Sequence, residues 1–143
     1  MSAELVAAYR STRYTVLDAV GEVVAEARVD EPSPAIDAVL EQHGATSGVF
    51  VTAWNPRSEP TADDVNAVAH ARLADDVDAL GLDALPHAGI GTDDAWHPEH
   101  GLLVLDLPEP EAIDLATSYG QNAIVVVERG RPARLVLTGV MSS

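Results

Sequence analysis

Polar side chains that could bind or transform a ligand gather in residues 50–70, which read FVTAWNPRSEPTADDVNAVAH. An apolar segment leads into a turn at Asn55 and Pro56, and a helix follows. Along that helix Asn66 and His70 are four residues apart, so they lie on one face. A helix start also presents free N–H groups and a partial positive charge, which favour an anion. The pattern predicts a polar or anionic ligand site at this strand-to-helix corner.

The predicted site combines an indole, amides, a hydroxyl group, an imidazole and two guanidinium groups. The indole offers a stacking surface, the amides donate and accept hydrogen bonds, and an arginine can contact an anion. The amides of GQNAIVVV would face the same corner if the strand that they open neighbours the FVTAW strand. The candidate ligand-binding residues are Trp54, Asn55, Arg57, Ser58, Asn66, His70, Arg72, Gln121 and Asn122.

Three functions stay open for the corner, which spans residues 52–70. The first is a non-catalytic domain that binds a small polar or anionic ligand. The second is a small enzyme in which His70 acts as general base while Asn66 and the helix start stabilise a developing negative charge. The third is a protein-interaction module whose polar corner is only structural, because buried polar groups need partners in any protein. Gln121 and Asn122 could likewise cap the preceding helix.

Metal and cofactor chemistry finds little support in the rest of the sequence. The acidic loop TDDAWHPEH offers candidate metal ligands at Asp93, Asp94, His97, Glu99 and His100. Their spacing matches no standard metal motif, so a solvated loop is the better interpretation. The GIG tripeptide lacks the context of a dinucleotide site, and no G-x-S-x-G elbow orders a catalytic serine. Cysteine is absent, which excludes thiolate chemistry. We predict no metal and no cofactor.

The charge of the chain bears on its partners and its environment. Its 143 residues include 23 acidic and 8 basic residues, the latter all arginine, for a net charge of −15. Such a chain repels phosphate backbones, which argues against direct nucleic-acid binding. No apolar run approaches the roughly 20 residues of a membrane span, and the N-terminus has no signal-peptide pattern. We expect a cytoplasmic protein without membrane contact, and the acidic excess also fits a halophilic host.

The elements that position the corner follow from hydrophobic periodicity and from turn residues. Extended segments are expected at 14–18, 21–29, 47–54 and 100–107 and on both sides of a hairpin turn at 128–131, with residues 83–91 as a strand or a connection. Helices are expected at 1–8, 33–43, 61–80 and 108–119. Thr61 and Asp64 resemble a capping box at the start of the longest helix. Its residues Leu73, Val77 and Leu80 are expected in the core.

These elements predict one α+β domain over residues 1–143, with the C-terminal strand reaching residue 138. Hairpins pair antiparallel strands, and helices between strands pack on a face of the sheet. We therefore expect a mainly antiparallel sheet of five to seven strands, covered by two or three helices. A ferredoxin-like arrangement is one specific form of this fold class.

A set of short motifs, taken in order, resembles the DUF3293 family of prokaryotic proteins. The motifs are YRSTRYTV, VTAWNPRSEP followed by Asn66 and HARL, W-x-P-E at 96–99, GLLVLDL and YGQNAIVVV, over roughly residues 9 to 128. The family has no established function, so the resemblance implies no activity. It implies that the family pattern falls on Tyr9, Thr52, Trp54, Asn55, Pro56, Ser58, Asn66, Arg72, Gln121 and Asn122, and not on His97 or His100.

Overall fold

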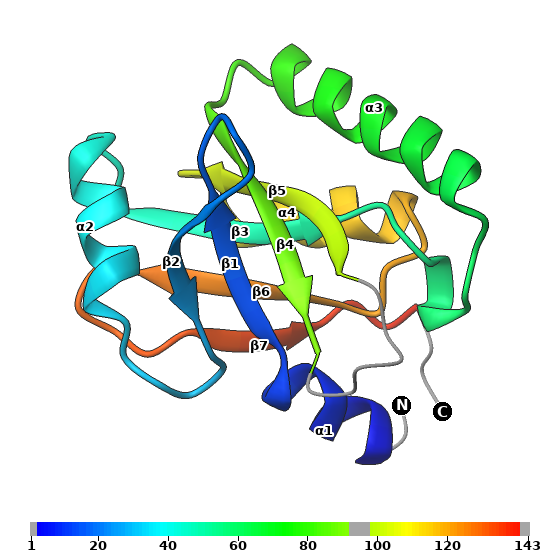
Figure 1. Ribbon diagram of the computed structural model, residues 1–143, viewed down its shortest axis with the longest axis horizontal. Coiled ribbons are helices and arrows are strands. Elements are labelled where there is room, and N and C mark those ends of the chain that lie inside the picture. Colours follow the sequence, from blue (N-terminus) through cyan, green and yellow to red (C-terminus); the bar gives the residue numbers. More distant parts are fainter. Residues whose placement is uncertain (1–2, 92–97, 141–143) are drawn as a thin grey trace.

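Residues 3–91 and 98–140, which the computed structural model describes, form one curled sheet with helices packed around it (Figure 1). The strands are β1 (Arg13–Leu17), β2 (Val23–Ala27), β3 (Ser47–Thr52), β4 (Ala84–Ile90), β5 (Glu99–Leu105), β6 (Ala123–Glu128) and β7 (Arg134–Leu137). The helices are α1 (Ala3–Ser11), α2 (Pro34–Gln42), α3 (Asp63–Ala79) and α4 (Glu109–Ser118), and a short 3-10 turn, η1 (Pro56–Ser58), follows β3. No helix within these described ranges is long and apolar enough to cross a membrane.

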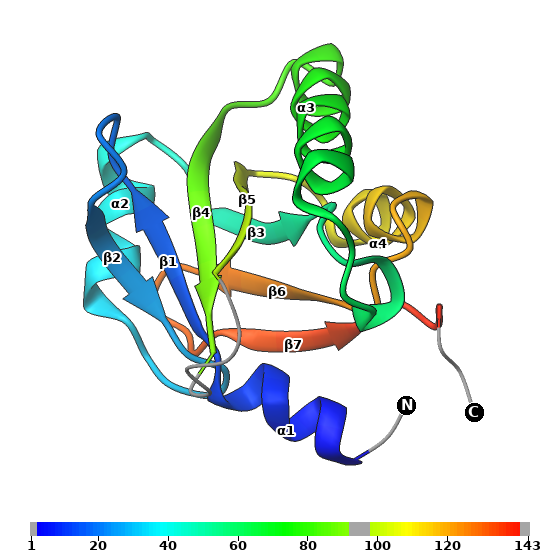
Figure 2. The ribbon, with the colours of Figure 1, turned by 45° about the vertical axis from the view of Figure 1, so that its right-hand side comes forward.

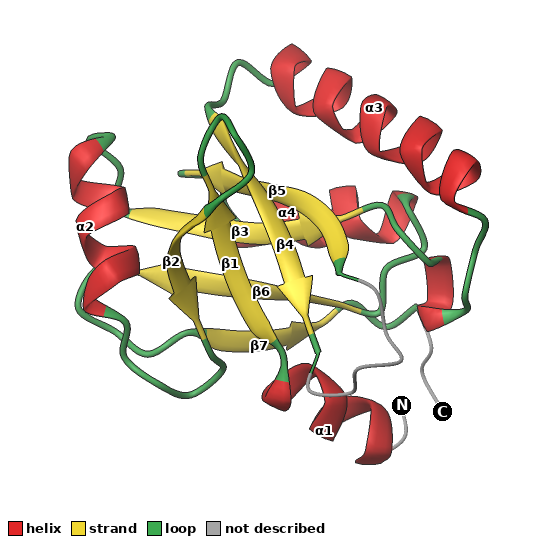
Figure 3. Ribbon diagram, in the orientation of Figure 1, coloured by secondary structure: helices red, strands yellow, loops and turns green. Residues whose placement is uncertain are grey.

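Neighbouring strands of the sheet run antiparallel, in the order β2-β1-β4-β5-β3-β6-β7 (Figure 3). The predicted α+β fold with a mainly antiparallel sheet of five to seven strands is therefore confirmed. The central part of the chain runs β3-α3-β4-β5-α4-β6, and its strands lie in the order β4-β5-β3-β6. This connectivity is that of a ferredoxin-like unit. The hairpin of β1 and β2 extends one edge of the unit, and β7 extends the other.

The two faces of the sheet bury separate cores, because side chains alternate along each strand. Val49 and Val51 of β3 pack with buried residues of α3 and α4 in one core. Phe50, between these valines, points to the opposite face and shares a second core with Tyr14 of β1 and Leu40 of α2. Figure 2 shows α3 and α4 together on one side of the sheet, with α2 on the other.

The sheet curls so that its two edges approach each other on the face that carries Phe50. Val29, just after β2, forms an isolated bridge with Ala133, just before β7. Both residues are buried in the same core as Phe50. This face is therefore concave. The concave face and α1 together line a cavity.

Local capping signals set the ends of α2. Ser33 caps α2 by accepting a hydrogen bond from the backbone N–H of Ile36 at 3.2 Å, and Pro34 is its first residue. Gly44 follows with a φ of 68°, a left-handed conformation that glycine adopts without steric cost. The predicted start and stop of this helix are confirmed.

The predicted capping box of the long helix is wrong. α3 begins at Asp63, two residues later than expected, and its N-cap residue, Ala62, makes no side-chain capping bond. The backbone N–H of Thr61 instead donates to Oδ1 of Asn55 at 3.0 Å. Asn55, eight positions before the helix, thus binds the backbone N–H that the side chain of Asp64 would bind in a capping box.

The far end of α3 also departs from the predicted stripe. Leu73 and Val77 are buried as expected, but Leu80 is 52% exposed. The helix ends at Ala79, and Gly81, with a φ of 73°, redirects the chain toward β4. Leu80 therefore lies beyond the surface that the helix covers.

Candidate functional site

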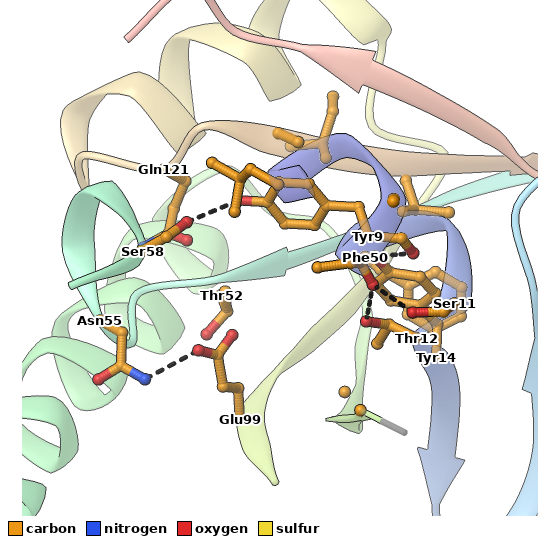
Figure 4. Close-up of a pocket in the computed structure, with 18 of the residues that line it drawn as sticks. Tyr9, Ser11, Thr12, Tyr14, Phe50, Thr52, Asn55, Ser58, Glu99 and Gln121 are labelled. Carbon is orange, nitrogen blue, oxygen red and sulfur yellow. Dashed lines mark hydrogen bonds between the residues drawn. The ribbon is translucent and has the colours of Figure 1, made fainter. Parts of the chain in front are cut away.

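A cavity of about 580 Å³ lies between α1 and the concave face of the sheet (Figure 4). Its walls come from α1, β1, β3, β4, β5 and β6 and from the loops beside them. The polar residues of its lining are Glu4, Tyr9, Ser11, Thr12, Tyr14, Thr52, Asn55, Ser58, His87, Glu99 and Gln121. Its apolar residues include Leu5, Phe50, Ala123, Ile124 and Val125. Of the candidate ligand-binding residues, Asn55, Ser58 and Gln121 line this cavity together.

A reciprocal pair of amides builds the corner beside the cavity. Oδ1 of Asn66 accepts the backbone N–H of Asn55 at 3.0 Å, and Nδ2 of Asn66 donates to Oδ1 of Asn55 at 3.0 Å. The same Nδ2 also donates to the carbonyl of Thr61 at 3.2 Å. Asn66 is 2% exposed, and both ends of its side-chain amide bind the loop before the helix. Its role is therefore to position Asn55. Asn55 adopts the left-handed conformation, with a φ of 48°, which asparagine tolerates better than most residues.

The side-chain amide of Asn55 also binds Glu99, and both residues line the cavity. Its Nδ2 donates to Oε1 of Glu99, at the start of β5, at 2.8 Å (Figure 4). Burial raises the pKa of the Glu99 carboxyl above its usual value, and the bond from Asn55 offsets part of that shift. Thr52 lies beside this pair in the lining, and its Oγ1 donates to the carbonyl of His100 at 2.7 Å. The Glu99 carboxyl group is thus fixed by a hydrogen bond and poorly solvated.

A second polar group joins three distant segments at another wall of the cavity. The hydroxyls of Tyr9 and Ser58 are 3.1 Å apart, and Nδ2 of Asn122 donates to Oγ of Ser58 at 2.8 Å. Oδ1 of Asn122 is buried and has no hydrogen-bond partner. Burial raises the pKa of the Tyr9 hydroxyl, so this phenol stays protonated at neutral pH. The free Asn122 oxygen is an acceptor that lacks a donor.

Gln121 ties the corner to the loop between α4 and β6. Its Nε2 donates to the carbonyls of Trp54 at 3.0 Å and Tyr119 at 3.3 Å. The backbone N–H of Arg57 donates to the carbonyl of Gly120 at 2.7 Å. β6 pairs with β3, as the shared corner requires. Gln121 and Asn122 precede the strand, which begins at Ala123.

The aromatic candidates of the corner gather on the other face of the sheet. The rings of Trp54 and His100 meet edge to face with centroids 5.3 Å apart. His70 of α3 is half-buried, and burial and then the neighbouring His100 lower its pKa. Nδ1 of His70 and Nε1 of Trp54 are buried without hydrogen-bond partners. These three side chains belong with the face that α3 covers, and none of them lines the cavity.

The two arginines of the candidate set also lie outside the cavity. Arg57 in η1 and Arg72 in α3 are exposed, and neither is among the cavity's lining residues. Arg57 nevertheless has a left-handed φ of 57°, because its backbone spans the tight turn toward Gly120. Its contribution at this corner is therefore its backbone.

An aromatic floor, which the sequence did not single out, completes the cavity. Phe50 lies 4.8 Å from the ring of His87 and 5.8 Å from the ring of Tyr14, centroid to centroid. His87 is buried, and burial lowers its pKa to about 4 although its bond to the Thr15 carbonyl opposes the shift. The imidazole is therefore neutral at neutral pH. Nδ1 faces that carbonyl at 3.1 Å and so carries the proton.

Sequence reasoning also missed the roles of Tyr9, Thr52 and Glu99. Tyr9 and Thr52 belong to the family pattern, and that was the signal that could have added them. The sequence presents Glu99 as a candidate metal ligand and as the last residue of the W-x-P-E motif, but not as a member of the ligand site. Among the residues that the structure describes, no group of three or more candidate ligands could hold a metal ion. The other acidic-loop candidates Asp93, Asp94 and His97, and Trp96 of the W-x-P-E motif, lie outside the described residues.

Glu99→Gln is expected to be more stable than the wild type at neutral pH, and this advantage is expected to shrink at acid pH. Glutamine keeps the oxygen that accepts from Asn55 but carries no charge. Because the folded-state pKa of Glu99 is raised above its ordinary 4.5, wild-type stability falls as pH rises from 4.5 through the folded pKa. Below pH 4.5 both states hold the proton, so the difference between variant and wild type shrinks. Urea unfolding of both proteins from pH 4 to 8 measures the difference in their free energies of unfolding. A difference that does not change with pH contradicts the prediction.

Comparison with known proteins identifies a family but no solved relative. The profile of a family described as "Protein of unknown function (DUF3293)" matches residues 51–124, just over half of the chain. This segment contains every candidate ligand-binding residue of the corner, whereas Tyr9 lies before it. No curated protein and no solved structure matches the chain. With the match spanning the strand-to-helix corner, Glu99 and both amides before β6, the chain belongs to the DUF3293 family of proteins of unknown function.

Proposed function

We propose that this protein is a small-molecule-binding domain and that its ligand occupies the cavity between α1 and the concave face of the sheet. The observation that carries the proposal is the convergence of held polar groups on a cavity of about 580 Å³. Ligand pockets typically measure about 300–1,000 Å³ and combine apolar walls with a few oriented polar groups. The cavity has both features.

The polar groups supply orientation. The Asn55–Glu99 pair stands at one part of the wall, and Tyr9 and Ser58, the latter bound by Asn122, stand at another. Phe50 and Tyr14 add an apolar floor to the same cavity. A ligand with an apolar body and a polar head would match this distribution.

Preorganisation also supports binding. Asn66 and Gln121 hold the loop of Trp54 and Asn55 from two sides through hydrogen bonds of 3.0 Å. Ser58 has a left-handed φ of 61°, a strained conformation that this network maintains. A site whose groups are already fixed loses less conformational entropy when a ligand binds.

The other two hypotheses find less support in the geometry. His70 is outside the cavity, so we do not assign it the role of general base. An exposed partner surface is not needed to account for Asn55, Ser58 and Gln121, because these three residues line the cavity. We keep the cytoplasmic location, the salt-rich host and the absence of nucleic-acid and membrane partners as predictions.

Filling the cavity is the direct test. Ala8 of α1 is exposed to solvent and lines the cavity, so Ala8→Phe should block it without burying a polar group. Ala3 of the same helix is also exposed and is not a lining residue, which makes Ala3→Phe a matched control. Thermal unfolding is measured with a panel of small alcohols, amides, amines and acids. A ligand at 100 times its Kd adds about 2.7 kcal/mol of stability.

The proposal expects at least one ligand that stabilises the wild type and Ala3→Phe but not Ala8→Phe. A ligand that stabilises all three proteins equally binds elsewhere. If every hit behaves in that way, or if the panel yields no hit, the cavity is not the binding site that we propose.

A further inference from the structure

We propose that the ligand of this cavity is an organic cation, a protonated amine with an apolar body, whose ammonium group binds at Glu99. This inference rests on the proposed function and specifies the chemical class of the ligand, a cation in place of the polar or anionic ligand expected from the sequence. It is carried by the sign of the charges that line the cavity, by the acceptor sites of the Glu99 carboxylate and by the apolar floor.

The charged side chains of the lining are acidic. They are Glu99, which is half-buried, and Glu4, which is exposed, and none of the described lining residues is Lys or Arg. His87 adds no positive charge, because its buried ring is neutral. A bound anion would face the Glu99 carboxylate without a countercharge, whereas a cation would neutralise it. The net charge of −15 acts in the same direction over longer range.

The Glu99 carboxylate offers the cavity acceptor sites beyond the one that Asn55 uses. The Glu99 carboxylate has about four lone-pair sites, and one bond, from Asn55, reaches its Oε1. The hydroxyl proton of Thr52 is already directed at the His100 carbonyl, so that group does not donate to a ligand. An ammonium group carries three donors and no acceptor, which complements such a set.

The apolar floor of the cavity favours a ligand with an apolar body. Phe50, Tyr14 and Val125 of β6 lie in the lining and belong to the same buried core, so they give the cavity apolar surface. A fully hydrated inorganic cation would gain nothing from this surface. An alkyl or aryl amine would place its carbon skeleton there and its charge at Glu99, because burial of apolar area favours binding.

Matched ligands test the charge of the head group. Three trios are used, in which a benzyl, butyl or cyclohexylmethyl body carries an ammonium, a hydroxyl or a carboxylate group. Binding is measured by calorimetry and protein NMR at pH 8 and 0.15 M salt, where an aliphatic amine is protonated and weak surface attraction is screened. The proteins are the wild type, Ala8→Phe, Glu99→Gln and Glu4→Gln, the last as a matched loss of one lining carboxylate.

In at least one trio, we expect the amine to bind the wild type at least tenfold more tightly than the alcohol. We expect the acid to bind most weakly. Glu99→Gln should remove the preference for the amine while leaving the affinity for the alcohol nearly unchanged. Glu4→Gln should lower the affinity for the amine less than twofold, and Ala8→Phe should abolish binding.

The outcomes separate this inference from the proposed function. If alcohols or acids bind as tightly as amines and Ala8→Phe blocks them, the cavity is a ligand site but the cation assignment is wrong. If amines bind Ala8→Phe as well as the wild type, their binding is surface attraction, and the cation assignment is also wrong. If no member of any trio binds, the inference and the proposed function fail together.

Discussion

Gly101→Ala is expected to destabilise the fold by about 3 kcal/mol, at the upper end of the usual cost of overpacking a core. Gly101 lies in β5 opposite Thr52 of β3 and His87 of β4. A Cβ atom there would press against the backbone carbonyl of Val51 and come within 2.9 Å of the His87 ring. The backbone carbonyl cannot turn aside without breaking the strand pairing. The ring is hemmed in by Phe50, so it cannot absorb the clash either.

Gly89→Ala is the matched control, because this glycine also lies in a strand and lines the cavity. The nearest atom to its added Cβ would be the methyl carbon of Thr12 at 3.6 Å, an ordinary contact. The expected change is below about 1 kcal/mol, and a small gain through the unfolded state is compatible with it. Urea unfolding followed by circular dichroism compares both variants with wild type. A loss below about 1 kcal/mol for Gly101→Ala would falsify the close approach of β3 and β5 that shapes the cavity wall.

Asn66→Ala is expected to destabilise the protein by about 2–3 kcal/mol. The substitution leaves the backbone N–H of Asn55 without its acceptor and the Oδ1 of Asn55 with one donor fewer. Leaving one buried polar group unsatisfied costs about 1–3 kcal/mol, and the lost side-chain volume adds to it. Asn66→Asp should cost at least as much. Its carboxylate cannot donate and would face the Oδ1 of Asn55 and the carbonyl of Thr61.

Val65→Ala serves as the control for Asn66, since this neighbour on α3 is 55% exposed. Its expected change is within about 0.5 kcal/mol, as for most surface substitutions. The free energy of unfolding of all three variants is measured in urea at pH 7. If Asn66→Ala unfolds like Val65→Ala, Asn66 does not hold the corner, and a direct role toward a ligand becomes the better account of its burial.

These two positions act through the scaffold of the cavity. Gly101 lets β3 and β5 approach closely at the wall, and Asn66 keeps the left-handed Asn55 in place. The residue that meets a ligand in our proposal is Glu99, which both neighbourhoods support. Loss of stability and loss of binding should therefore separate: the first at Gly101 and Asn66, the second at Glu99.

The location of the corner could be predicted, but the role of each of its residues could not. Asn66 was expected to face a ligand because it shares a helical stripe with His70. In the folded protein its amide turns to Asn55, eleven residues earlier in the chain. His70 lies with Trp54 on the face that α3 covers. Periodicity identifies which residues share a helix face, but it does not reveal what that face meets.

The sequence by itself determined the local elements, the fold class and the family. Hydrophobic alternation, turn residues and the cap at Ser33 act over a few neighbours, so their consequences can be predicted before the fold is known. Only the tertiary structure decided the cavity. Asn55 and Glu99 are 44 residues apart and Tyr9 and Ser58 are 49 residues apart, and strand register brings them together. Register and curl depend on the packing of all seven strands, a condition that no local stretch of sequence contains.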